Sequence, residues 1–166
     1  IQPTFLAPSQ YQPNADADLF LIDSFQPLKA PERPAIFLNP GAAETTISSW
    51  SGAHPIAAGI RTRDLKIANA RILTAGKGET VIASAKEGAL IVAGAKTVTL
   101  GFHPLRSNLR YSLATPLLFA NIFQWIAPET FLRQEVLAAT PGAVSVELAE
   151  SYAPEKLRVL DAEGAA

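Results

Sequence analysis

Apolar residues occur along this chain in short runs that prolines, glycines and polar residues separate. The runs DLFLID at 18–23 and AIFLN at 35–39 are each about one strand long and predict buried strands. Three prolines within residues 24–34 predict a loop between them. Residues 65–73, LKIANARIL, alternate more loosely and predict a third strand. Residues 1–17, with three further prolines, indicate an irregular or edge segment.

Three more apolar runs lie close together in residues 79–102, namely ETVIASA, ALIVAG and TVTLGF. The connectors KEG and AK are as short as hairpin loops, so this region predicts an antiparallel meander. Residues 42–64, in contrast, are mostly small and polar, and only HPIAAGI indicates a short helical turn.

The clearest helix follows the meander. Thr115 is a possible N-cap, Pro116 suits the first helical position, and Pro128 stops the helix. Several large apolar side chains share one helical face and predict packing on the sheet: Leu118, Ile122, Trp125 and Ile126, widened by Phe119 and Phe123.

Beyond Pro128 the apolar period changes from helical to alternating. Residues 143–150, AVSVELAE, and 156–162, KLRVLDA, each alternate and predict two strands. They suit either a hairpin or the first strands of a separate β-domain. The sequence therefore predicts a main domain over 1–127 and a β appendage over 128–166.

Composition narrows the function classes. The chain has 166 residues, is 48% hydrophobic and 17% charged, and carries a net charge of −1. This balance predicts a folded core and gives no basic excess for nucleic acid. No apolar run approaches the roughly 20 residues that a membrane span needs. The chain has no initiator methionine, which suggests a part of a longer protein, and no cysteine, which removes thiol and disulfide chemistry.

Nucleophilic catalysis would have to use one of two histidines, His54 or His103. No G-x-S-x-G elbow presents a serine to either of them. Each histidine precedes a proline, which favours extended geometry at the start of a loop. We therefore expect no catalytic residue, and we keep a serine-type hydrolase using His103 or His54 as the alternative.

Metal and phosphate motifs are incomplete. NADAD places oxygen-bearing side chains at 14, 16 and 18, as in a calcium loop. However, Leu19 stands where that loop needs glycine, and Phe25 where it needs a bidentate glutamate. AGKGET at 75–80 lacks the first glycine of a P-loop, because Arg71 occupies its position. We therefore expect no metal site and no cofactor.

Five basic residues could gather to hold an anion, although scattered surface cations are the simpler interpretation. They are Arg61, Arg63, Lys66, Arg106 and Arg110.

The order of elements over about residues 15–127 resembles a known bacterial domain. It runs ADLFLID-SFQP, PAIFLNPGA, HPIAAGI, the meander, and then TVTLGFHPLRSNLRYSLATPLLFANIFQWI. This order is similar to the class I glutamine amidotransferase-like domain of membrane-anchored von Willebrand factor A-domain proteins of the aerotolerance type. Its most specific part is the polar turn, the proline-led helix and the asparagine before the final tryptophan.

The resemblance implies an α/β fold: a flavodoxin-like three-layer sandwich with a mostly parallel sheet and a C-terminal antiparallel meander, here with a short β appendage. It also implies that the family's chemistry has been lost. GFHP at 101–104 is similar to the family's F-H-P-E motif, but Leu105 replaces the glutamate. AIFLN ends in Asn39, Pro40 and Gly41 with no cysteine, so the thioester route is excluded.

We therefore expect a non-catalytic interaction or scaffold module of a larger membrane-anchored bacterial protein, with the extracytoplasmic side favoured. Its expected partner is a protein or a neighbouring domain of the same chain, with no nucleic acid and no membrane span in this segment. Ligands of α/β folds bind where parallel strands end. The predicted crevice residues are Asp23, Ser24, Asn39, Pro40, Gly41 and His103.

Overall fold

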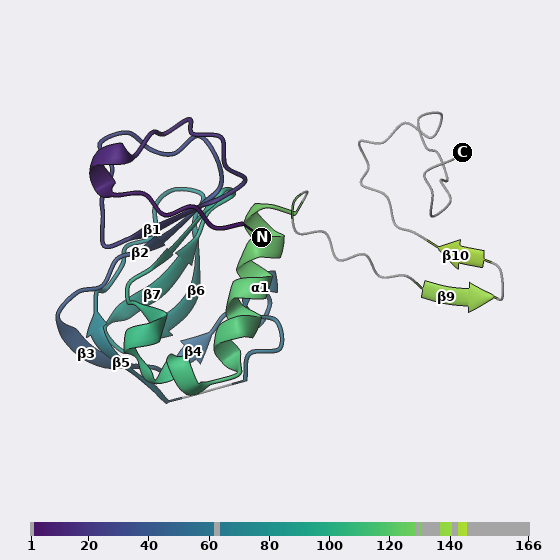
Figure 1. Ribbon diagram of the computed structural model, residues 1–166. Coiled ribbons are helices and arrows are strands. Elements are labelled where there is room, and N and C mark those ends of the chain that lie inside the picture. Colours follow the sequence, from purple (N-terminus) through teal and green to yellow (C-terminus); the bar gives the residue numbers. More distant parts are fainter. Residues whose placement is uncertain (1, 62–63, 129, 131–136, 141–142, 146–166) are drawn as a thin grey trace. The chain divides into compact units, whose positions relative to one another are not determined.

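The computed structural model describes residues 2–61, 64–128, 130, 137–140 and 143–145 (Figure 1). The chain divides into two compact units, Ile1–Phe131 and Leu132–Ala166. The sequence placed the boundary a few residues earlier, after residue 127.

The first unit contains a mixed sheet of six strands in the order β1-β2-β8-β7-β6-β4 (Figure 1). Strands β1, β2 and β8 are parallel, whereas β7, β6 and β4 continue the sheet as antiparallel neighbours. The predicted meander is observed as β6, β7 and β8. The bounds are β1 Phe20–Asp23, β2 Ala35–Leu38, β4 Ser49–Trp50, β6 Thr80–Ala85, β7 Gly88–Ala93 and β8 Thr97–Leu100.

A separate antiparallel pair consists of β3, Ala43–Ile47, and β5, Leu65–Ala70. Strand β5 lies within the predicted run at 65–73. Strands β3 and β4 were not predicted, because their residues are mostly polar and half-exposed and show no apolar period. They form because they pair with β5 and β6.

The only α-helix among the described residues is α1, Ala114–Ile126. It begins before the predicted N-cap. The hydroxyl of Ser112 accepts from the Ala114 N–H at 3.1 Å, while the Thr115 hydroxyl donates to the Leu109 carbonyl. Thr115 is therefore not the cap, and Pro116 lies in the first turn, where no helical partner is needed for its missing N–H.

The described residues of the first unit also form four short 3₁₀ helices: η1 Pro8–Gln10, η2 Pro55–Ala57, η3 Pro104–Arg106 and η4 Asn108–Tyr111. The helical turn expected in HPIAAGI is η2. In the second unit, β9 Leu137–Thr140 pairs antiparallel with β10 Ala143–Ser145. Strand β10 begins the predicted run at 143–150, whereas the predicted strand at 156–162 lies outside the described residues.

The prediction of a flavodoxin-like three-layer α/β sandwich is wrong. That fold covers both faces of a mostly parallel sheet with crossover helices. Here three of the six strands run as antiparallel neighbours, and a single α-helix packs on the described sheet. The connection from β1 to β2 is a loop, because Pro27, Pro31 and Pro34 interrupt any helix there.

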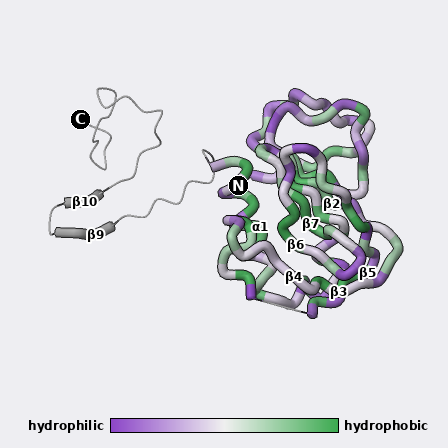
Figure 2. The backbone as a smooth tube through the Cα atoms, turned by 180° about the vertical axis from the view of Figure 1, so that it is seen from behind, coloured by the Kyte–Doolittle hydropathy of each residue, from purple (hydrophilic) through white to green (hydrophobic). Residues whose placement is uncertain are grey.

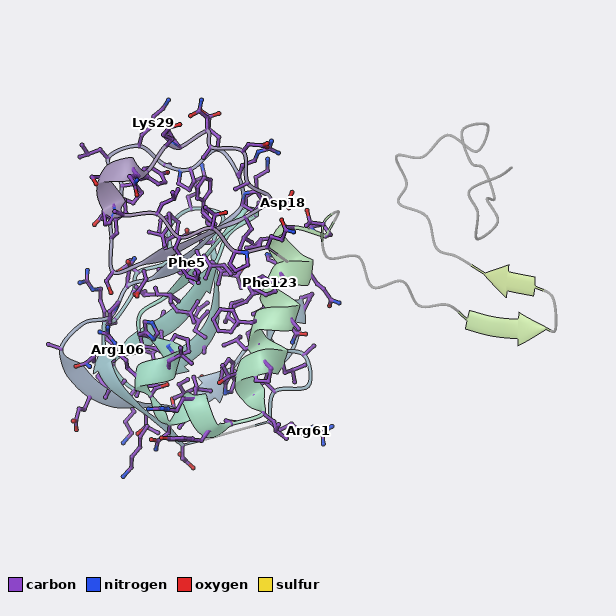
Figure 3. The ribbon with its side chains drawn as sticks, in the orientation of Figure 1. Phe5, Asp18, Lys29, Arg61, Arg106 and Phe123 are labelled. Atoms are coloured by element: carbon purple, nitrogen blue, oxygen red, sulfur yellow. The ribbon has the colours of Figure 1, made fainter. Side chains whose placement is uncertain are left out.

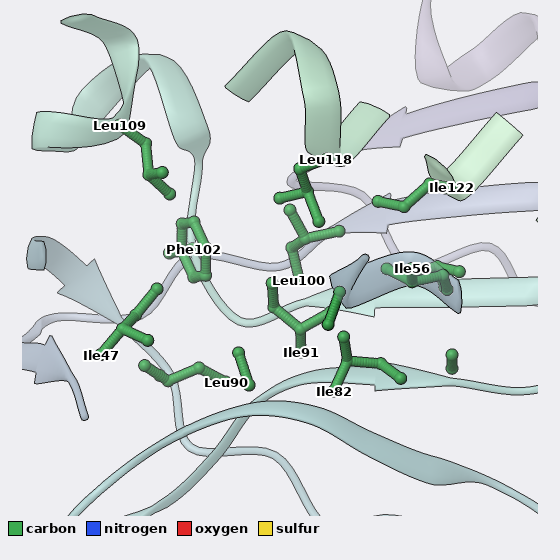
Figure 4. Packing of buried hydrophobic residues seen from close by; sticks show 14 of the residues in the cluster. Ile47, Ile56, Ile82, Leu90, Ile91, Leu100, Phe102, Leu109, Leu118 and Ile122 are labelled. Atoms are coloured by element: carbon green, nitrogen blue, oxygen red, sulfur yellow. The ribbon is translucent and has the colours of Figure 1, made fainter. Parts of the chain in front are cut away.

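The main core lies between α1 and one face of the sheet. The register places Leu38, Leu100 and Ile91 in one row across neighbouring strands. Leu118 and Ile122 of α1 are fully buried over this face (Figure 4). Burial of each such side chain contributes about 2 kcal/mol. Figure 2 shows the hydrophobic residues concentrated on the central strands β2, β6 and β7.

A smaller aromatic cluster ties the N-terminal segment to the edge of the sheet. The Tyr11 ring contacts Phe20 and Phe25 edge-on, each at 5.8 Å between centroids. Its hydroxyl donates to the Lys29 carbonyl at 3.1 Å. Burial, with a smaller contribution from Glu32, raises the pKa of Tyr11. The proline-rich start of the chain is thereby fixed against β1 and the loop after it.

The chain after β5 passes very close to the ends of β2 and β8. The Gly41 N–H donates to the Asn69 carbonyl at 2.8 Å, and the Arg71 N–H donates to the Gly101 carbonyl at 2.6 Å. A Cβ on Gly41 would lie 2.3 Å from the Ala70 oxygen, and one on Gly101 would lie 2.1 Å from the Arg71 oxygen. Only glycine permits this approach.

We therefore expect Gly101→Ala to lower the free energy of unfolding by about 3 kcal/mol, because backbone must shift to admit the methyl group. Gly52→Ala is the matched control, since nothing lies within 4 Å of the added carbon. Urea denaturation of both variants measures the difference. Equal stabilities would contradict the close approach.

Candidate functional site

The predicted crevice residues come from three neighbouring parallel strands. Asp23 is the last residue of β1, Asn39 follows β2, and His103 lies in the loop after β8. The register pairs Asp23 with Leu38 and Leu38 with Leu100, so the three strands end level with one another. The loops that follow them therefore meet at one edge of the sheet.

At this edge Asp23 contacts two polar side chains. The Ser24 hydroxyl donates to Asp23 Oδ1 at 2.9 Å. His103 Nε2 lies 3.6 Å from Asp23 Oδ2, an ion-pair distance rather than a hydrogen bond. The imidazole of His103 is 15% exposed and the Asp23 side chain 47%. The carboxylate therefore sits between the hydroxyl and the imidazole.

The other nitrogen of His103 is used within its own loop. Nδ1 accepts from the Leu105 N–H at 3.2 Å and caps η3. We assign the proton of the neutral ring to Nε2, which faces Asp23, because Nδ1 is an acceptor. Neither nitrogen is directed at the Ser24 hydroxyl. Among the described residues, no serine hydroxyl forms a hydrogen bond with either histidine.

Ser24 has an uncommon backbone conformation, with φ of 53°. A non-glycine residue rarely adopts this left-handed region, and such residues cluster at functional sites and tight turns. Its N–H donates to the Leu38 carbonyl at 2.8 Å and so continues the ladder between β1 and β2. This bond holds the residue where the chain leaves the sheet.

The remaining crevice residues are held by the chain itself. The Asn39 N–H donates to the Leu100 carbonyl at 2.8 Å. Pro40 accepts at its carbonyl from Arg71 Nη2 at 3.3 Å, and Gly41 packs on Ala70. The backbone that follows β5 therefore occupies the ends of β2 and β8. The structure brings the side chains of Asp23, Ser24 and His103 together. Residues 39–41 instead contact the chain through their backbone.

Sequence reasoning did not place Arg71 at this edge. Arg71 directly follows β5, which begins far from β2 in the sequence. Its position at this edge is therefore fixed by the long-range pairing of β5 with β3. The available signal was a glycine shortly after each of the two strands: Gly101 directly follows β8, and Gly41 comes three residues after β2. Such glycines mark close backbone approach.

His54 has a role parallel to that of His103. Its Nδ1 accepts from the Ile56 N–H at 3.2 Å and caps η2, and its ring lies 4.5 Å from Trp125. From α1, Asn121 Nδ2 donates to the carbonyls of Ile56 and Ala58 at 3.1 and 2.9 Å. His54 thus belongs to a joint between η2 and α1. Burial lowers its pKa.

The predicted cations do not form one cluster. Lys66 and Arg106 line the same open groove of about 360 Å³. Arg110 stacks over Tyr111 at 4.8 Å, and Figure 3 shows Arg61 well away from Arg106. Arg63 lies outside the described residues. Within the described ranges, no three histidine or acidic side chains form a potential metal site.

No helix in the described part of the chain is long and apolar enough to cross a bilayer. No family model matches the sequence, and no curated protein matches it significantly. The resemblance to an amidotransferase-like domain therefore stays a prediction.

The lowered pKa of His54 predicts a pH dependence of stability. The folded state favours the neutral form of the His54 imidazole over the protonated form more than the unfolded chain does. The stability from His54 is therefore complete above its ordinary pKa of about 6.5 and is lost as the pH falls through the lowered folded value. We expect His54→Asn, which keeps a capping acceptor, to reduce the loss of unfolding free energy between about pH 7.5 and about pH 5.

Urea denaturation at both pH values measures this loss. His103→Asn is the control, because it leaves His54 in place and should keep the His54 part of the pH dependence. A His54→Asn variant as pH-sensitive as the wild type would refute the assignment.

Proposed function

We propose that this chain is a non-catalytic interaction module of a larger, membrane-anchored bacterial protein. It contacts a protein partner, or a neighbouring domain of the same chain, through the segment that follows His103. The membrane-anchored setting is supported by the resemblance of residues 15–127 to the amidotransferase-like domain of such proteins. The mode of contact is supported by exposure, hydrogen bonding and packing around η3 and η4.

The observation that carries the proposal is a group of exposed large apolar side chains on one short segment. Leu105 is 61% exposed, Tyr111 81% and Leu113 90%. Large apolar side chains that are this exposed and this close together in the chain are candidates for a protein contact surface. Tyr111 is also a residue type that interfaces favour, and Arg110 stacks on its ring.

The segment that carries these side chains has a fixed shape. Ser107, which is 6% exposed, donates its hydroxyl to the Pro104 carbonyl at 2.7 Å and accepts from the Leu109 N–H at 3.3 Å. Leu109 is fully buried beside Phe102 (Figure 4). A surface that is ordered before contact loses less conformational entropy when a partner binds.

The hydrogen bonding of the two histidines agrees with a structural use. Among the described residues, neither histidine accepts a hydrogen bond from a serine hydroxyl, and each accepts one backbone N–H at Nδ1. In nucleophilic catalysis the base takes the proton of the nucleophile directly. At the strand ends, the Ser24 proton is instead directed at a carboxylate.

A crosslinking experiment tests the contact surface. We expect a photoreactive residue at position 113 of the parent protein to crosslink to one discrete protein or domain, and Tyr111→Glu to abolish the product. Position 28 is the control, since Leu28 is also fully exposed but lies in the loop after β1. Crosslinking at 28 as strong as at 113, or no product at 113, would refute this surface.

The second candidate is a serine-type hydrolase, which one observation favours: Ser24 has a left-handed backbone and lies beside the Asp23–His103 pair. For His54 the corresponding neighbour is the Trp125 ring. We expect a fluorophosphonate probe to leave the protein unlabelled, because the Ser24 hydroxyl donates to the Asp23 carboxylate and not to an imidazole. Labelling that Ser24→Ala removes, measured by intact mass, would establish the hydrolase.

A further inference from the structure

A second surface is the groove that Lys66 and Arg106 share. One wall is the β3–β5 pair, where Thr46 and Lys66 are register partners. The other wall is the junction of η3 and η4, with Arg106, Ser107 and Asn108. The volume of about 360 Å³ is within the range of sites that bind small groups.

Both cations of the groove lack a carboxylate partner among the described residues, because neither takes part in an ion pair within 4.0 Å. The nearby hydroxyl of Thr45 is engaged with Glu87 at 2.7 Å. This bond, more than any other cause, lowers the pKa of Glu87. Glu87 is thus charged and hydrogen-bonded outside the groove lining, and the two cations remain available to a ligand.

The wall that carries Arg106 is rigid. The buried Ser107 hydroxyl joins η3 to η4 through its bonds to Pro104 and Leu109. Arg106 and Asn108 flank this anchored residue and are both exposed. Their side chains therefore project from a backbone that is already in place for binding.

The charges of the groove favour an anion. Lys66 and Arg106 contribute two positive charges and Glu44 contributes one negative charge, which leaves one net positive charge. This net charge attracts a carboxylate or a phosphate, and Glu44 weakens the attraction for both. The guanidinium offers a planar pair of donors that fits a carboxylate, and Lys66 adds a second charge.

We propose that this groove binds an oxyanion, a carboxylate or a phosphate group, between Lys66 and Arg106. The same chemistry could come from a small organic acid, from a free phosphate or from an acidic side chain of a peptide. The groove shares the η3–η4 segment with the proposed contact surface, but its cations are not the exposed residues at 105, 111 and 113.

NMR titration of the full chain with three probes tests it: sodium acetate, inorganic phosphate, and an N-acetylated, C-amidated pentapeptide with one central glutamate among glycines. We expect shifts of the backbone amides of 66 and 106–108 with at least one of these anions. The probe that binds most tightly identifies the kind of oxyanion: the peptide a peptide-borne carboxylate, acetate a small organic acid, and phosphate a phosphate group. No shift of these amides with any of the three probes would overturn the assignment.

Charge variants provide the second arm. Arg106→Gln and Lys66→Gln should each weaken binding of the tightest anion about tenfold, since each removes a charge-assisted hydrogen bond. Glu44→Gln should strengthen binding about threefold, because it removes a like charge. Arg110→Gln is the matched control and should bind as the wild type does. An effect of Arg110→Gln equal to that of Arg106→Gln, or weaker binding by Glu44→Gln, would refute the site.

Discussion

The backbone of residues 69–71 lies against the ends of β2 and β8 at a distance that admits no side chain. Gly41 and Gly101 make this possible, and the hydrogen bonds from the Gly41 and Arg71 N–H groups fix it. The arrangement joins the β3–β5 pair to the six-stranded sheet. It also decides what the strand ends can do, since the space where α/β proteins bind ligands is here filled by the chain's own backbone.

The two His-Pro sequences illustrate one local solution used twice. In each, proline keeps the histidine extended, and Nδ1 accepts the N–H two residues later to start a 3₁₀ helix. The surroundings then differ: His54 meets Trp125 beside α1, and His103 meets Asp23 beside Ser24. The same dipeptide thus lies between η2 and α1 in the first case and beside the polar residues at the end of β1 in the second.

The η3–η4 segment connects the two surfaces that the structure presents. Its buried residues, Ser107 and Leu109, hold it against the core. Its exposed residues divide by chemistry, with Arg106 and Asn108 in the polar groove and Leu105 and Tyr111 outside that lining. Within η3, Leu105 and Arg106 are available to different contacts, because successive residues of a 3₁₀ turn point in different directions.

Local patterns determined much of the secondary structure. The continuous runs at 18–23 and 35–39, the meander over 79–102 and the apolar helix before Pro128 were all found, because burial on one or both faces leaves a period in the sequence. The absence of cysteine likewise excluded a thiol nucleophile without any coordinates. Of the predicted crevice residues, Ser24 and His103 both contact Asp23, since parallel strands end at one edge.

The tertiary structure decided what these elements become. The polar strands β3 and β4 form through partners distant in sequence, and no local period marks them. The loop from β1 to β2 replaces a crossover helix, so the fold is not the three-layer sandwich that the resemblance implied. The direction of the Ser24 proton, the close approach of Arg71 and the shared groove of Lys66 and Arg106 all depend on distances between separate elements. Such distances follow from long-range hydrogen bonds and packing, which residue order alone does not specify.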